Sequence, residues 1–126
     1  MGENEDKSRK KKGISKDLRR MLHSALCNYA KLYMKELGYN FYELKTAIPD
    51  LIATDRFGNI IVIEALTHPT PQLIEDKITR YRYQKPKQIL FIVPYLTDEI
   101  MHTITGKPDV DIIDMGLEEG EEPVEE

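Results

Sequence analysis

Residues 47–66 read AIPDLIATDRFGNIIVIEAL, and this stretch decides the fold. Asp50 follows Pro49 at the head of one apolar run, and Glu64 lies inside a second apolar run beyond the residues DRFGN. Turn residues between two apolar runs predict a hairpin of two strands. Residues 59–66 are apolar on both alternating faces, which is typical of a central strand covered on both sides. We therefore expect Glu64 to lie inside a sheet.

A carboxylate at Glu64 needs a partner. Removing an unpaired charge from water is costly, so a buried Glu is protonated, paired with a basic side chain or bound to a cation. For Glu64 alone, a Lys or Arg partner at the strand end is the simpler explanation. Asp50 on the neighbouring strand favours a second explanation, in which the two acids share a site for a divalent cation.

The rest of the chain predicts an α/β domain around this hairpin. Ser15 and Thr70 are each placed to begin a helix as N-caps, and Gly38 is placed to end the first one. The strand after the second helix follows a helical crossover, so it should run parallel to a partner in the same sheet. The predicted elements are a helix at 15–37, a strand at 39–46, the two hairpin strands, a helix at 71–83, a strand at 88–94, a short helix at 97–105 and a short strand at 110–114.

Composition places a single domain at residues 14–115. A chain of 126 residues is long enough for one hydrophobic core. Its one cysteine, Cys27, cannot form an internal disulfide, which favours a reducing, cytoplasmic location. The apolar runs are of strand length, so we expect no membrane partner.

Charge is strongly segregated along the chain. The net charge is −4, but six of the 22 acidic residues lie in the tail at 116–126, so the remainder has 18 basic and 16 acidic residues. We expect the tail and the arm at 1–13 to be disordered. Basic residues that can neutralise the phosphates of a nucleic acid lie in the arm and at the start of the first helix. They are Lys7, Arg9, Lys10, Lys11, Lys12, Lys16, Arg19 and Arg20. The alternative to nucleic-acid binding is a flexible arm whose charges are simply solvated.

The motifs and their order resemble the PD-(D/E)XK nuclease superfamily, which includes restriction endonucleases and archaeal Holliday-junction resolvases. The resemblance rests on IPDLIA, IVIEAL, a helix ending KITRY and the strand ILFIVP, and it covers residues 15–94. It implies a restriction-endonuclease-like core: a helix, three strands, a helix and a strand, with a mixed central sheet flanked by helices.

The resemblance also implies roles for individual residues. Asp50, Glu64 and the backbone carbonyl of Ala65 would be ligands of Mg²⁺ or Mn²⁺. The superfamily places a lysine two residues after the Glu, where this chain has Leu66. Lys77 on the following helix would replace that lysine, since the lysine has moved there in some branches.

Further candidates have weaker support. Lys45 is an alternative to Lys77, and for both lysines the simpler explanation is a solvated surface charge. Accessory positions are Gln72 at a helix start, Glu36 or Glu43 as an additional acid, and His68 in the loop after Glu64. His23, His102 and Cys27 have no ligand pattern that singles them out, and a small buried hydrophobe is the simpler role for Cys27.

The sequence thus favours a magnesium-dependent endonuclease or junction-resolving nuclease that acts on DNA as a homodimer. One alternative is a catalytically inactive nucleic-acid-binding module of the same fold. Another is a protein-interaction or regulatory domain without a nucleic-acid partner.

Overall fold

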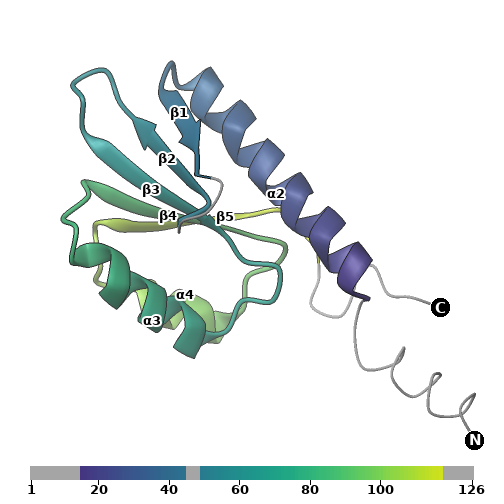
Figure 1. The fold of residues 1–126 in the computed structure, drawn as a ribbon. Helices are drawn as coiled ribbons and strands as arrows, with labels where there is room; N and C mark the ends of the chain where they lie inside the picture. The colour runs from purple at the N-terminus through teal and green to yellow at the C-terminus, as the bar shows by residue number, and fades with distance from the viewer. Residues whose placement is uncertain (1–14, 45–48, 118–126) are drawn as a thin grey trace, which may run out of the picture.

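The computed structural model describes residues 15–44 and 49–117, which form a five-stranded sheet with helices on both faces (Figure 1). The strand order follows the chain, β1-β2-β3-β4-β5. The long helix α2 lies across one face, and α3 and α4 lie together on the other. The predicted arm and acidic tail fall almost entirely on residues 1–14 and 118–126, outside the described residues.

Helix α2 (Lys16–Glu36) begins and ends where its sequence predicts. The Ser15 hydroxyl accepts a hydrogen bond from the backbone N–H of Leu18, at 3.1 Å. After the helix, Gly38 has a φ of 77°, a conformation that glycine adopts without steric cost. Leu26, Ala30 and Met34 recur every fourth residue and form the buried stripe of the helix.

The sheet is mixed. β1 (Asn40–Glu43), β2 (Leu51–Thr54) and β3 (Ile60–Ala65) form an antiparallel meander. β4 (Gln88–Val93) and β5 (Val110–Asp114) then add parallel to β3 in turn.

Helical crossovers connect the parallel strands. α3 (Pro71–Arg82) joins β3 to β4, and Thr70 caps its first turn through the backbone N–H of Leu73. α4 (Asp98–Ile104) joins β4 to β5. The expected parallel pairing of the strand after α3 is confirmed.

Two hydrophobic clusters lie on opposite faces of the sheet. Ile61, Ile63 and Ala65 of β3 pack in the cluster that contains the buried stripe of α2. Val62 and Leu66 pack in the cluster that contains residues of α3 and α4. Because side chains alternate along a strand, Glu64 points to the α3 face.

These observations confirm the predicted α/β fold with a mixed sheet flanked by helices. The first strand is shorter than predicted, Asn40–Glu43 instead of 39–46, and residues 45–48 lie outside the described residues. Across residues 15–44 and 49–117, none of the helices is both long and apolar enough to cross a membrane.

Candidate functional site

The hairpin brings Asp50 and Glu64 together. Leu51 pairs with Ile63 in the antiparallel ladder, so Asp50 lies opposite Glu64 one residue further on. The backbone N–H of Asp50 donates to Oε1 of Glu64 at 3.2 Å. In return, Oδ2 of Asp50 accepts from the backbone N–H of Ala65 at 2.9 Å. The two carboxylates are thus held by the backbone next to each other.

Glu64 is buried, with 5% of its surface exposed. Besides the Asp50 N–H, its carboxylate accepts from Nζ of Lys77 at 2.7 Å and from the hydroxyl of Tyr81 at 3.0 Å. A buried carboxylate is tolerated when it is paired and hydrogen-bonded, and these contacts meet that requirement.

Lys77 and Tyr81 reach Glu64 from one side of α3. They are four residues apart, so their side chains lie on the same helix face. Nζ of Lys77 also lies 5.9 Å from the centroid of the Tyr81 ring. Burial and the Glu64 charge raise the pKa of Tyr81 well above its ordinary value. The hydroxyl therefore stays protonated and remains a hydrogen-bond donor.

Leu66, two residues after Glu64, is buried in an apolar position. It shares the α3 face of the strand with Glu64, and it is 4% exposed in the cluster with Ile74 and Ile78. A lysine in this apolar position would carry a desolvation cost. Lys77 approaches the same carboxylate from α3, with 19% of its side chain exposed.

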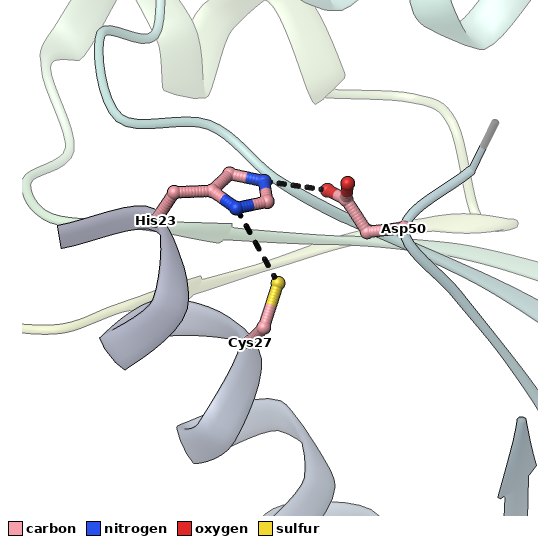
Figure 2. Close-up of side chains that lie close together, drawn as sticks. All are labelled: His23, Cys27 and Asp50. Atoms are coloured by element: carbon pink, nitrogen blue, oxygen red, sulfur yellow. Dashed lines mark hydrogen bonds and ion pairs between the residues drawn. The ribbon is translucent and has the colours of Figure 1, made fainter. Parts of the chain in front are cut away.

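On the α2 side, Asp50 interacts with His23 and, through it, with Cys27 (Figure 2). Nε2 of His23 lies 3.1 Å from Oδ2 of Asp50, and Nδ1 lies 3.9 Å from Sγ of Cys27. Hydrogen bonds to Asp50 and Cys27 raise the pKa of His23 from 6.5 to about 10 against the opposing effect of burial. At neutral pH the ring is therefore a cation.

The His23 cation keeps Asp50 ionised. Burial raises the pKa of Asp50, but the hydrogen bonds from His23 and from the Ala65 N–H outweigh it and hold the pKa below its ordinary value. The ammonium of Lys77 acts in the same direction. A carboxylate that remains ionised and partly exposed is suited to bind a cation.

A hollow of about 300 Å³ opens beside Asp50. His23, Cys27 and Asp50 line it together with Lys31 and Glu43. The Lys31 ammonium and the Glu43 carboxylate form an ion pair of 2.8 Å. Another hollow, of about 480 Å³ between α2 and β5, is larger but is lined by neither Asp50 nor Glu64.

The structure separates the accessory candidates. Glu43 lines the same hollow as Asp50, whereas Glu36 is exposed in the last turn of α2. The Gln72 amide donates to Asp76 at 2.8 Å, and Nδ1 of His68 lies 3.4 Å from the Tyr95 hydroxyl.

Ala65 is buried with its N–H bonded to Asp50, and the role of its carbonyl as a ligand stays a prediction. Lys45 lies outside the described residues.

The basic surface is described only in part. Lys16, Arg19 and Arg20 are exposed in the first turns of α2, and Arg20 lies 3.6 Å from the Asp17 carboxylate. Arg9, Lys10, Lys11 and Lys12 fall outside the described residues. Their contact with DNA stays a prediction.

Two residues of the site, His23 and Cys27, were not singled out by the sequence motifs. Their spacing of four places both on one side of a helix, and this is the signal that could have drawn attention to them. Ligand atoms of His23, Cys27 and Asp50 all lie within 4.8 Å of one another. The site therefore offers two donor sets for a cation: the carboxylates of Asp50 and Glu64, and the mixed set with nitrogen, sulfur and oxygen.

Comparisons with known proteins bear on the fold. No family model matches the chain, and no curated protein matches it. Among solved structures it is similar to a repair endonuclease from Pyrococcus abyssi, with a TM-score of 0.53 and 14% sequence identity. The likeness covers 75% of this chain but 46% of the endonuclease, so this chain spans less than half of that protein. Similarity at this identity concerns the fold alone, and it is consistent with a nuclease-like α/β core.

Proposed function

We propose that this chain is a metal-dependent nuclease that hydrolyses phosphodiester bonds in DNA. The observation that carries the proposal is the convergence of Asp50, Glu64 and Lys77 at the end of the central strand β3. Two adjacent carboxylates with an ammonium beside them are the groups that bind a divalent cation and stabilise added negative charge on a phosphate.

The donor set fits Mg²⁺ or Mn²⁺. Both ions prefer hard oxygen ligands, and Asp50 and Glu64 supply carboxylate oxygens. Within the described part of the chain, both hydrogen bonds on the Asp50 carboxylate use Oδ2, which leaves Oδ1 for a cation. When bound, the ion would supply a Lewis acid and lower the pKa of a bound water.

Each protein group then has a defined task. Asp50 and Glu64 hold the cation, and the His23 ring keeps Asp50 ionised. Lys77 orients the attacking water and offsets the negative charge that develops on the phosphate. Tyr81 fixes the orientation of the Glu64 carboxylate, so it is a positioning residue.

A nucleic-acid-binding module without catalysis is the second candidate. The observation that favours it is Leu66, which packs in the core at the position where the superfamily has its lysine. Such a module would bind DNA in a salt-sensitive manner, and its binding would survive Glu64→Ala. If the chain binds DNA in this way but does not cleave it with any divalent metal, the binding module is favoured over the nuclease.

We also propose that the nuclease acts as a homodimer, because two sites would address the two strands of a duplex. Sedimentation equilibrium of the full chain, with and without duplex DNA, tests this. A monomer under both conditions would contradict it.

The test of the function is a cleavage assay on duplex, single-stranded and branched DNA with Mg²⁺ or Mn²⁺. We expect cleavage of at least one substrate by the unmodified chain, and its loss in Asp50→Ala and Glu64→Ala. The absence of metal-dependent cleavage, or cleavage that both variants retain, would refute the proposal.

A further inference from the structure

His23, Cys27 and Asp50 form a cluster that the hydrolysis mechanism uses only in part. His23 and Cys27 lie one turn apart on α2, and Asp50 lies at the start of β2. Figure 2 shows the three side chains pointing toward one another, with the imidazole between the thiol and the carboxylate. The mechanism requires the Asp50 carboxylate and the charge of His23 but gives Cys27 no task.

The ligand chemistry of this cluster differs from that of the acid pair. Thiolate and imidazole are poor ligands for Mg²⁺ and good ligands for Zn²⁺ and similar transition-metal ions. A tetrahedral site with bonds of about 2.0–2.3 Å places its ligand atoms roughly 3.3–3.7 Å apart. Nε2 of His23 lies 3.1 Å from Oδ2 of Asp50, and the 3.9 Å contact with Sγ of Cys27 is made by the other ring nitrogen, Nδ1. One ion binds a single ring nitrogen, so the separation that applies to all three residues is the 4.8 Å within which one ligand atom of each lies.

The cluster can be reached by an ion and closed around it. All three residues are of intermediate exposure, and they line the hollow of about 300 Å³. Their ligand atoms lie within 4.8 Å of one another, so rotations of about 1 Å at the side-chain ends would gather them around an ion.

We propose that His23, Cys27 and Asp50 form a three-ligand site for a zinc-class transition-metal ion, which shares Asp50 with the hard-cation position at Asp50 and Glu64. Binding of the ion would release a proton from the His23 ring, since only a deprotonated ring nitrogen is a metal ligand. Three protein ligands leave one coordination position open, as in zinc sites that bind water or substrate rather than in closed structural sites. The three ligand residues line the hollow, and Lys31 lines it as well. The site requires no nuclease activity, so it stands independently of the proposed function.

Cobalt is the appropriate probe for the site. Co²⁺ occupies zinc sites, and a bond from thiolate to cobalt produces a charge-transfer absorption in the near ultraviolet. Cys27 is the only cysteine of the chain, so this absorption reports on Cys27 alone. The experiment is a Co²⁺ titration of the reduced full chain, followed by addition of Zn²⁺.

We expect a saturable absorption at one Co²⁺ per chain that Zn²⁺ abolishes. Cys27→Ser should lose it, and His23→Gln should weaken Co²⁺ binding by at least about tenfold. Glu64→Gln should retain it, although this variant should bind Mn²⁺ at the acid pair at least about tenfold more weakly. His102→Gln, on α4, is the matched histidine control and should behave like the unmodified chain.

Two results would overturn the site. One is the absence of the absorption in the unmodified chain. The other is an absorption that His23→Gln leaves unchanged, since Cys27 would then bind cobalt without His23. Circular dichroism of each variant separates loss of a ligand from loss of the fold. Glu64→Gln removes a ligand of the hard-cation position and leaves all three ligands of the zinc site in place, so failure of the zinc site is distinguishable from failure of the nuclease site.

Discussion

Nζ of Lys77 lies 2.7 Å from Oε2 of Glu64, although the two residues are 13 positions apart in the chain and belong to different elements. The β3 strand supplies the carboxylate, and α3 supplies the ammonium from the opposite side of the site. The position two residues after Glu64, where the superfamily has its lysine, is occupied by Leu66, which is part of the core. The charge pair therefore depends on how α3 packs against the sheet.

Tyr81→Phe tests how the buried carboxylate is positioned. The variant removes the hydrogen bond to Oε1 of Glu64, and a bond to a charged group contributes about 1.5–3 kcal/mol to the free energy of unfolding. We expect a loss of this size in urea denaturation and a decrease of less than about tenfold in the cleavage rate, since the hydroxyl donates to Glu64 and acts by orienting that carboxylate. Tyr83→Phe, at a 90% exposed position, is the control. Equal stability of the two variants would contradict the role of Tyr81.

Asp50→Asn and Glu64→Gln test the hard-cation position. Each variant keeps the size of the side chain but removes the charge that attracts the ion. We expect Mn²⁺ affinity, measured by isothermal titration calorimetry, to fall by at least about tenfold in each. Glu75→Gln changes an exposed acid on α3 and should leave the affinity unchanged. Unaltered Mn²⁺ binding in both site variants would show that the ion binds elsewhere.

Asp55, in the hairpin turn, makes the stability of the protein depend on pH. Its carboxylate accepts from the side chain and backbone of Asn59, from Lys87 and from the backbone of Phe57, and these bonds hold its pKa well below the ordinary value of 3.8. A depressed pKa in the folded state stabilises the protein above the unfolded pKa, and this contribution is lost as the pH falls below it.

The measurement is urea denaturation of Asp55→Asn and the unmodified chain from pH 7 to pH 3. We expect the variant to be less stable at pH 7 and the difference to shrink below about pH 4. Asp17→Asn, with its side chain 86% exposed, should show little difference at any pH. A deficit in Asp55→Asn that stays constant down to pH 3 would contradict the linkage.

The start of α2 is the described part of the predicted DNA-binding surface. Each phosphate contact contributes about 0.9 to the slope of log K against log salt for duplex DNA. If Lys16 and Arg19 each contact one phosphate, the double variant Lys16→Gln/Arg19→Gln should reduce that slope by about 1.8 in fluorescence anisotropy. Lys35→Gln, at the other end of the helix, is the control. An unchanged slope in the double variant would exclude this end of α2 from the interface.

The elements of the fold were predictable because local signals agree with the tertiary packing. Ser15 and Thr70 cap their helices as expected, and Gly38 takes a positive φ after α2. Apolar residues on both faces identified β3 as a central strand, and the helical crossover before β4 predicted its parallel pairing. The hairpin register, set by the turn at Asp55, then placed Asp50 opposite Glu64.

The contacts that cross between elements were not predictable from local pattern. Lys77 was suggested by resemblance alone, because nothing in a helical periodicity fixes how far an ammonium reaches across a sheet. His23 and Cys27 looked ordinary, since their significance depends on Asp50, which is 27 positions from His23 in the chain. Their proximity to Asp50 emerges only when α2 is packed against the start of β2.

Lys77→Met tests the central claim, that Lys77 supplies the ammonium of a metal-dependent nuclease site, most directly. The measurement is the single-turnover rate of DNA cleavage in saturating Mn²⁺, with Lys85→Met, at an exposed position after α3, as the matched control. We predict a rate about 10²–10³ lower in Lys77→Met than in Lys85→Met, with Mn²⁺ still bound, because the lost group acts on charge in the transition state. A rate in Lys77→Met equal to that of the control would contradict the claim.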